Sequence, residues 1–219
     1  MSSPVRPAVI GILGGIAAGK STVAEFLRAR GCKILDADQI VQDFLEQPTV
    51  IDELVARLGK EILSRDGGIS RQALAGQVFR HKDLLEALEG ILHPKVRAEL
   101  FAGLRRLLGE PSVAAVVLDV PLLLEKSPLR AACDYFIFVD CPAETRKERA
   151  RTLRGLSAQE LEQREAHQMP PEEKRKVADL VVHNDGEPSK LTRQLERWLE
   201  RIGGFQNLPR RALPLPEQP

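Results

Sequence analysis

The chain alternates between short apolar runs and longer stretches whose apolar residues recur at helical spacing. Apolar runs bounded by polar or turn residues are typical of strands buried in a parallel sheet. Such runs occupy 8–13, 32–35, 113–118, 135–139 and 180–182. Helical periodicity covers 21–30, 39–108 and 189–202. The order of these segments predicts an α/β fold in which helices flank a parallel sheet.

Two long segments interrupt this alternation, and a third ends it. Residues 39–110 hold no strand-like run, so we expect a helical insertion beside the sheet. Residues 143–176 are dense in Arg, Lys, Glu and Gln with few apolar anchors, which is the composition of an exposed, loosely held helical lid. Residues 203–219 combine Gly-Gly with Leu-Pro-Leu-Pro and predict a disordered tail. One domain spanning 1–202 would then have a core made of 6–38, 111–142 and 177–202.

Composition narrows the setting without identifying the chemistry. The 219 residues carry 32 Lys and Arg against 31 Asp and Glu, so the charge balance gives no reason to expect nucleic acid or a membrane surface as a partner. Cys32, Cys133 and Cys141 lack metal-ligand spacing and stand beside apolar residues, which predicts buried thiols in a reducing compartment. We see no signal peptide before the first apolar run and no run of membrane-spanning length, and therefore expect a cytoplasmic protein.

The first apolar run leads directly into a glycine-rich segment with a specific spacing. Gly14 and Gly19-Lys20-Ser21 fit G-x-x-x-x-G-K-[ST], with a strand expected before the segment and a helix after it. Glycines let the backbone wrap around phosphate oxygens, and the positive end of the following helix adds to the attraction. Lys20 can reach the β- and γ-phosphates, and the Ser21 hydroxyl can hold Mg²⁺.

This spacing predicts a nucleoside triphosphate site. Its expected residues are Gly14, Gly15, Ile16, Ala17, Ala18, Gly19, Lys20, Ser21 and Thr22. A glycine-rich turn that only caps an ordinary helix is the competing interpretation.

The rest of the sequence separates the classes of protein that use such a loop. A GTPase would carry a guanine-reading N-K-x-D, and the nearest stretch, Val182-His183-Asn184-Asp185, lacks the lysine. A helicase or transporter ATPase would end a strand in an Asp-Glu pair, whereas here the strand ends in Asp119-Val120-Pro121. The pattern favours a small-molecule kinase with a nucleotide core, a helical acceptor-binding insertion and an Arg-rich lid.

Several short blocks follow one another in an order that is specific as a set. They are Gly14-Gly15-Ile16 with Gly19 to Thr22, then Asp36-Ala37-Asp38, then Asp66-Gly67 with Arg71, Leu74, Val78 and Phe79, then Ile91-Leu92-His93-Pro94, then Pro121 to Glu125, and lastly Ala178 to Val182 with Asn184 and Gly186. Each block is weak by itself. Together they make the chain up to Ile202 resemble the dephospho-CoA kinase family.

This resemblance implies transfer of the γ-phosphoryl group of ATP, with Mg²⁺, to the ribose 3′-hydroxyl of dephospho-coenzyme A, the last step of coenzyme A biosynthesis. ATP and dephospho-CoA would be the substrates. Asp38 matches the second Asp of the family's D-A-D and would accept or orient the hydroxyl proton, at a strand end where open α/β sheets bind ligands. Helix N-capping is the competing interpretation for both Asp36 and Asp38.

Further positions are implied on the acceptor side. They are Arg71, His93, Pro121, Leu122 and Glu125. The last three would form a strand-to-helix turn that walls the acceptor pocket. His93-Pro94 is expected to open a new helix, where a packed or capping His is the alternative, and Arg71 can equally be a solvated residue in a first helical turn.

The lid and the strand ends supply the remaining candidates. Phosphoryl transfer needs positive charge over the γ-phosphate, and Arg149 falls where the family's lid begins with an Arg. The family's usual Arg-Asp pair is replaced by Leu153-Arg154-Gly155, so Arg154 is a second candidate, with a solvated helix face as the alternative for most basic residues here. Asp119 would support the Mg²⁺ shell indirectly. Asn184-Asp185-Gly186 would either meet the adenine through its backbone or form a plain turn.

Two other functions remain open at this point. The chain could be another P-loop kinase, acting on a nucleoside monophosphate or another small alcohol, although such kinases typically carry more acceptor-phosphate arginines. It could also be a regulatory protein that binds ATP without turning it over. The presence of Lys20, Ser21 and Asp38 argues against that class, because a degenerate member would be expected to lose one of them.

Overall fold

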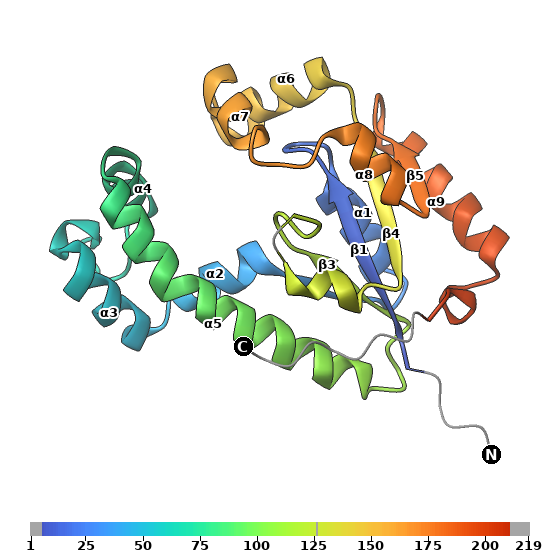
Figure 1. Ribbon diagram of the computed structural model, residues 1–219, viewed down its shortest axis with the longest axis horizontal. Coiled ribbons are helices and arrows are strands. Elements are labelled where there is room, and N and C mark those ends of the chain that lie inside the picture. Colours follow the sequence, from blue (N-terminus) through green and yellow to red (C-terminus); the bar gives the residue numbers. More distant parts are fainter. Residues whose placement is uncertain (1–5, 126, 211–219) are drawn as a thin grey trace. The chain divides into compact units, whose positions relative to one another are not determined.

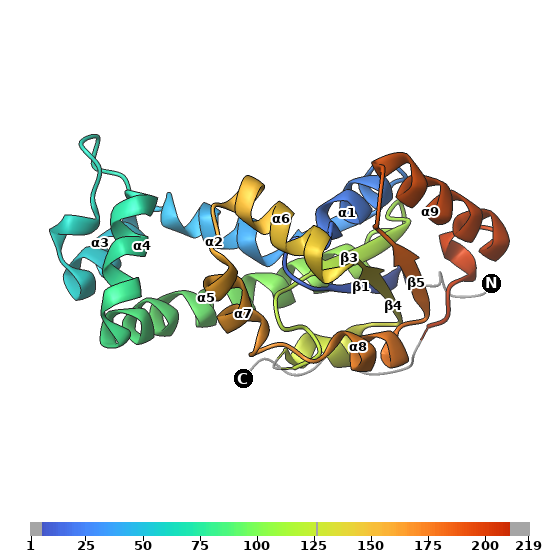
Figure 2. The same ribbon diagram turned by 90° about the horizontal axis from the view of Figure 1, so that it is seen from above.

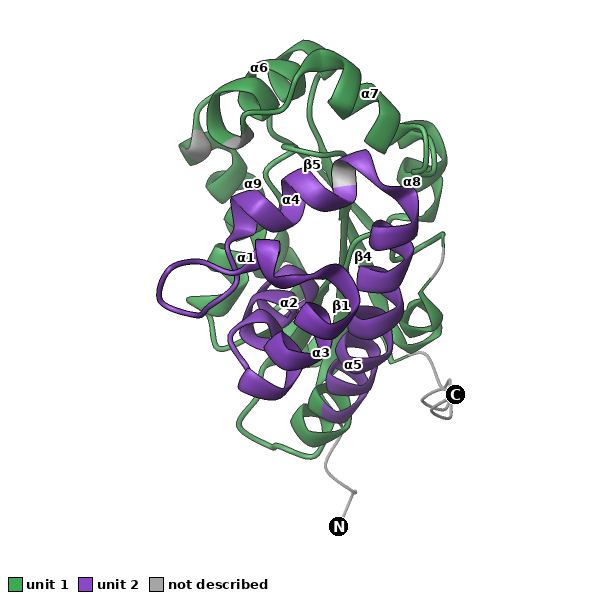
Figure 3. Cartoon of the chain, turned by 90° about the vertical axis from the view of Figure 1, so that its left-hand side faces the viewer, with its two compact units in different colours: residues 1–35, 103–219 green, residues 36–102 purple. Residues whose placement is uncertain are grey.

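The computed structural model describes residues 6–125 and 127–210, apart from the side chains of Phe79, Arg154 and Pro188. The chain forms two compact units, residues 1–35 with 103–219 and residues 36–102, coloured separately in Figure 3. The insertion predicted over residues 39–110 begins close to the start of the smaller unit and extends past its end at residue 102. Within the described residues, no helix combines the length and apolarity needed to cross a membrane.

The larger unit is built on a five-stranded sheet in the order β2-β3-β1-β4-β5 (Figure 1). The strands are β1 (Ala8–Gly14), β2 (Lys33–Asp36), β3 (Ala115–Asp119), β4 (Tyr135–Asp140) and β5 (Leu180–His183). β1 pairs in parallel with β3 and β4, and β4 pairs in parallel with β5. Every residue of β1 is buried, as expected of a central strand covered on both faces. The predicted α/β class is therefore confirmed.

Helices cover both faces of this sheet. α1 (Lys20–Arg28) and α9 (Pro188–Ile202) pack together on one face, and α8 (Pro171–Val177) lies on the other (Figure 2). α1 ends at Arg28, two residues before the predicted end at residue 30, and Gly31, with a left-handed φ of 87°, lies in the turn that follows. The core on this side joins Leu27, Ile137 and Trp198.

The Arg-rich segment is helical, as its composition predicts. It contains α6 (Ala143–Arg154), α7 (Ala158–Glu165) and α8. It is better anchored than expected, because Ala150, Leu161 and Lys174 are buried. The three cysteines are also buried and free, in agreement with the expectation of buried thiols.

The smaller unit is helical. It holds α2 (Ala37–Leu45), α3 (Pro48–Leu58), η1 (Lys60–Ile62), α4 (Arg71–Arg80) and the first part of α5 (Lys82–Leu108). Apolar residues from all of these except α2 form its buried core, with Leu54, Ile62, Leu74 and Ile91 among them, and partly buried residues of α2 pack against that core. The helical prediction for this stretch is confirmed.

His93-Pro94 does not open a new helix, as the sequence had suggested. Both residues lie inside the 27-residue helix α5. A proline in a helix interior removes the hydrogen bond to the carbonyl four residues earlier, here Gly90, and costs about 3 kcal/mol. Burial of Ile91, Leu92 and Val96 on both sides of the proline offsets this cost, so the helix continues through it.

The expectation of a disordered tail from residue 203 is wrong for its first part. Gly203 caps α9 in a left-handed conformation, and a short 3-10 helix, η3 (Phe205–Asn207), follows. Phe205 and Leu208 are buried against the sheet-side core, where Phe205 lies edge-on to Trp198. Pro-rich composition did not reveal these two apolar anchors. Residues 211–219 lie outside the described part of the chain.

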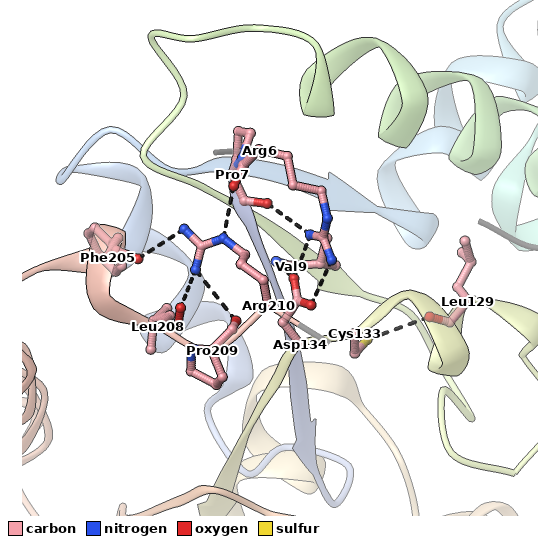
Figure 4. Close-up of polar contacts among 10 residues, drawn as sticks. All are labelled: Arg6, Pro7, Val9, Leu129, Cys133, Asp134, Phe205, Leu208, Pro209 and Arg210. Carbon is pink, nitrogen blue, oxygen red and sulfur yellow. Dashed lines mark hydrogen bonds and ion pairs between the residues drawn. The ribbon is translucent and has the colours of Figure 1, made fainter. Parts of the chain in front are cut away.

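Arg6, just before β1, contacts both a buried carboxylate and this C-terminal segment (Figure 4). Asp134 is 0% exposed and accepts hydrogen bonds from both Arg6 Nη atoms, at 2.6 and 2.7 Å, and from the Val9 amide at 2.9 Å. Arg210 Nε donates to the Arg6 carbonyl at 2.8 Å. Burial lowers the pKa of Arg210, although the Asp134 charge opposes that shift. A further 3-10 helix, η2 (Pro128–Ala132), precedes Asp134 in the chain.

Candidate nucleotide-binding site

The glycine-rich loop leaves the carboxyl end of β1 and enters α1, as its motif requires. Gly19 caps α1 with φ of 96°, a conformation that favours glycine, and Ala17 is also left-handed with φ of 58°. The first turn of α1 therefore presents its unpaired amide groups at the loop. Such a terminus attracts an anion such as a phosphate.

Lys20 is the first residue of α1, and its side chain folds back over the loop. Its Nζ donates to the Gly14 carbonyl at 3.2 Å and to the Gly15 carbonyl at 3.1 Å. The ammonium group is thus held beside the backbone that would wrap a phosphate. Ser21 and Thr22 are exposed in the next positions of the helix.

The residues present suit a magnesium ion. The exposed Ser21 hydroxyl lies at the start of α1, and Asp119 ends β3, the strand that pairs with β1. Hydroxyl and carboxylate oxygens are the ligands that Mg²⁺ prefers beside a phosphate. No cluster of three or more His, Cys, Asp or Glu that could hold a metal occurs among the described residues. A metal here would depend on the nucleotide for further ligands.

Asn184 locks the loop, a role that the sequence did not reveal. Its side chain is 6% exposed and donates from Nδ2 to the Ala18 carbonyl at 2.8 Å. Its own amide donates to the Asp140 carbonyl at 2.7 Å, which continues the pairing of β5 with β4. A Cβ at Gly19 would lie only 2.1 Å from Nδ2, so this approach requires glycine at 19. The sequence singled out Asn184 only as part of Asn184-Asp185-Gly186, either as a backbone contact of the adenine or as a plain turn.

Two arginines of α6 face the same loop. Arg149 lies beside Asn184 and Cys141, with 3.5 Å from Nη2 to Asn184 Oδ1 and 3.5 Å from Nη1 to Cys141 Sγ. Burial raises the pKa of the Cys141 thiol, while the nearby Arg149 charge acts in the opposite direction. Arg146 donates from Nε to the Cys141 carbonyl at 3.2 Å and pairs with Glu165. The Arg154 side chain lies outside the described part, so its role stays a prediction.

The two aspartates of D-A-D have different environments. Asp36 is the N-cap of α2, and its Oδ1 accepts from the amides of Asp38 and Gln39 at 2.9 and 3.1 Å. The capping interpretation is therefore right for Asp36. Asp38 is exposed in the first turn of α2, and its carboxylate makes no hydrogen bond with any described residue. Its carboxylate thus stays available for another group.

The remaining acceptor-side candidates come from both compact units. Arg71 is exposed at the start of α4 and donates to Gln42 Oε1 at 3.3 Å. His93 is exposed on α5. Pro121 is exposed, and Leu122 has a left-handed φ of 53° within the turn after β3. Their roles toward an acceptor stay predictions.

Glu125 contacts residues of the Arg-rich segment, which the sequence did not predict. Its Oε1 accepts from the Met169 amide at 2.6 Å and lies 3.5 Å from Lys174 Nζ. Lys174 in turn donates to Gln168 Oε1 at 2.9 Å. Burial lowers the pKa of Lys174, and the Glu125 charge opposes this shift. The turn after β3 is thereby tied to the segment between α7 and α8.

Comparison with known proteins gives a consistent result. Residues 8–190 match a family model described as Dephospho-CoA kinase. A curated dephospho-CoA kinase of Bdellovibrio bacteriovorus is 36% identical over 88% of this chain and 96% of its own length. A solved structure from Thermus thermophilus is 38% identical, with a TM-score of 0.69, and covers 91% of this chain and 100% of its own.

A solved dephospho-CoA kinase from Campylobacter jejuni is 25% identical, with a TM-score of 0.66, over 89% of this chain and 97% of its own. The family match spans the phosphate loop, the helical unit and the Arg-rich segment together. This chain belongs to the dephospho-CoA kinase family.

Proposed function

We propose that this protein transfers the γ-phosphoryl group of ATP to the 3′-hydroxyl of the ribose of dephospho-CoA, giving coenzyme A and ADP. The observation that carries the proposal is the family match over residues 8–190. Cytoplasmic location and independence from nucleic acid and membranes belong to the same proposal.

The phosphate loop and Lys20 would bind the nucleotide. Lys20 Nζ, now hydrogen-bonded to the carbonyls of Gly14 and Gly15, can exchange them for β- and γ-phosphate oxygens. Asn184 keeps the loop in shape by its bond to Ala18. Mg²⁺, when bound, would neutralise developing charge on the phosphates, with the Ser21 hydroxyl as a ligand and Asp119 as a supporting carboxylate.

Asp38 would accept or orient the proton of the attacking hydroxyl. Its carboxylate is exposed and not used in capping, in contrast with that of Asp36. Arg149, beside the loop, and Arg154 would supply positive charge to the transferring group. Arg71, His93 and the turn with Pro121, Leu122 and Glu125 would contact the acceptor.

One assay tests this proposal. Purified protein is incubated with ATP, Mg²⁺ and either dephospho-CoA or a panel of nucleoside monophosphates, and the product is identified by mass. We expect coenzyme A as the product. Phosphorylation of a nucleoside monophosphate instead would identify another P-loop kinase, and ATP binding without transfer to any acceptor would indicate a regulatory protein.

The Asp38→Asn variant tests the proposed base. General acid–base groups contribute roughly a hundredfold to ten-thousandfold to turnover, so we expect a fall of that order with nearly unchanged ATP affinity. Asp36→Asn keeps a side chain that can still cap α2 and serves as the matched control. Near-normal turnover of Asp38→Asn would refute the assignment.

A further inference from the structure

Arg146 has a sheltered guanidinium in an otherwise solvated helix. Its side chain is 11% exposed, whereas that of Arg151 on the same helix is 69% exposed. Nε donates to the Cys141 carbonyl at 3.2 Å, and Nη1 pairs with the carboxylate of Glu165, the last residue of α7. The guanidinium is therefore held in one place by two partners.

That place is directly against the phosphate loop. A Cβ built on Gly15 would lie 2.7 Å from Arg146 Nη1 and 3.1 Å from its Cζ. Gly15 does not have a left-handed φ, so its backbone would accept another residue. A side chain at position 15 would instead clash with the Arg146 guanidinium.

Two further cationic side chains lie at the phosphate loop beside this ion pair of Arg146 and Glu165. Lys20 lies over Gly14 and Gly15, and Arg149 Nη1 lies 4.0 Å from the Cβ position of Gly19. Three cationic groups thus surround a loop whose motif binds a polyanion. A guanidinium can hold either a carboxylate or a phosphate in the same forked geometry, so Glu165 and a phosphate are chemically equivalent ligands for it.

We propose that Arg146 is a further ligand of the nucleotide's phosphate chain, and that Glu165 competes with the phosphates for it. The proposal rests on the nucleotide binding of the proposed function. Glu165 acts as a positioning residue: it keeps the guanidinium beside Gly15 before the nucleotide binds, and weakening that pair is part of the cost of binding. A change at Glu165 should therefore affect ATP affinity through Arg146.

The experiment measures the Kd for ATP and for AMP by calorimetry in wild type and variants. A charge-assisted hydrogen bond corresponds to roughly tenfold to a hundredfold in affinity, so Arg146→Ala should raise the Kd for ATP by about tenfold or more and barely change that for AMP. Arg146→Lys, which keeps the charge without the fork, should lose less. Glu165→Gln should lower the Kd for ATP by roughly twofold to fivefold.

The double variant separates a direct effect from a general change in charge. If Glu165 acts through Arg146, the gain from Glu165→Gln should disappear in the Arg146→Ala background. Arg151→Ala is the matched control on α6, and Glu162→Gln, exposed on α7, is the matched control for charge. Circular dichroism verifies that each variant folds. If Arg146→Ala does not fold, the same comparison is made with Arg146→Lys and Glu165→Gln.

Several results would overturn the inference. They are a Kd for ATP unchanged by both Arg146 variants, an equal loss for ATP and AMP, and a gain from Glu165→Gln that persists without Arg146 or is matched by Glu162→Gln. Wild-type protein that binds no ATP would instead refute the proposed function itself. The two failures are therefore distinguishable.

Discussion

Asn184 connects the end of β5 to the phosphate loop by a single buried hydrogen bond. Replacement by Ala would leave the Ala18 carbonyl without this donor in a site of limited water access. An unsatisfied buried group costs about 1–3 kcal/mol, so we expect Asn184→Ala to raise the Kd for ATP several-fold and to lower the melting temperature. Calorimetric titration and thermal unfolding measure both effects.

The neighbouring Asp185 supplies the control for Asn184. It is exposed in the turn after β5, so Asp185→Ala should change the melting temperature little. If Asn184→Ala bound ATP as tightly as wild type, the loop would be held by its own backbone and not by this side chain.

Cys32 makes stability depend on pH in the alkaline range. Burial raises the pKa of this thiol from 9.0 to about 12. Below pH 9 both the folded and unfolded chains keep the proton, so the thiol adds no pH dependence there. Between about pH 9 and 12 only the unfolded chain loses it, so the free energy of unfolding falls as pH rises.

The test for Cys32 compares urea unfolding of wild type and Cys32→Ala from pH 8 to 11. The variant starts less stable because it leaves a small cavity, but its stability should fall less steeply with pH. Parallel curves for the two proteins would show that the thiol titrates normally in the folded state.

Site residues fixed by local spacing could be predicted, and those fixed by tertiary contacts could not. Gly14 to Thr22 form one continuous motif, so spacing alone located the loop. Asn184, Arg146 and Lys174 reach their partners across 166, 19 and 49 residues of sequence, respectively, and no local pattern marks such pairs. The charged composition of residues 143–176 predicted solvated helices, although Arg146 and Lys174 both lie in this segment.

At the scale of elements, apolar runs located the strands because central strands are buried on both faces. The prediction was wrong where the burial of apolar side chains outweighed the local preference of the sequence. Pro94 signals a helix start by composition, yet packing of Ile91 and Val96 carries α5 through it. The segment after α9 resembles a linker, but Phe205 and Leu208 are enough to anchor it.

This anchored segment gives a prediction of its own. A chain ending at residue 210 keeps Phe205, Leu208 and the Arg210 contacts, whereas a chain ending at residue 203 loses them all. Burying one large apolar side chain contributes about 1.5–3 kcal/mol, so ending at 203 should lower the free energy of unfolding by roughly 2–5 kcal/mol. Ending at 210 is the matched control and should change it little.

Chemical unfolding of the two truncated proteins measures this difference. Equal stability of both would mean that the core closes without Phe205 and Leu208. Asp134→Ala is an independent probe of the same region, since it leaves Arg6 without its buried partner and should cost about 3–5 kcal/mol.

At the scale of the whole molecule, the division into two compact units separates the proposed nucleotide site from part of the proposed acceptor side. The phosphate loop, Arg146, Arg149 and Asn184 all belong to the unit of residues 1–35 and 103–219. Of the proposed acceptor-side residues, Asp38, Arg71 and His93 belong to residues 36–102, whereas Pro121, Leu122 and Glu125 belong to the larger unit. Each substrate should stabilise the segments that bind it, because a ligand protects the structure that binds it from local opening.

Hydrogen exchange with each substrate alone tests which segments bind it. ADP should slow exchange in the loop of residues 14–22 and at the start of α6, with little change in α3 and α4. Dephospho-CoA should slow exchange within residues 36–102 and in the turn of residues 121–125. Asp38→Asn should leave the ADP pattern unchanged, because we propose that its carboxylate serves the acceptor hydroxyl. If dephospho-CoA protected only the loop, it would occupy the nucleotide site, and the helical unit would need another role.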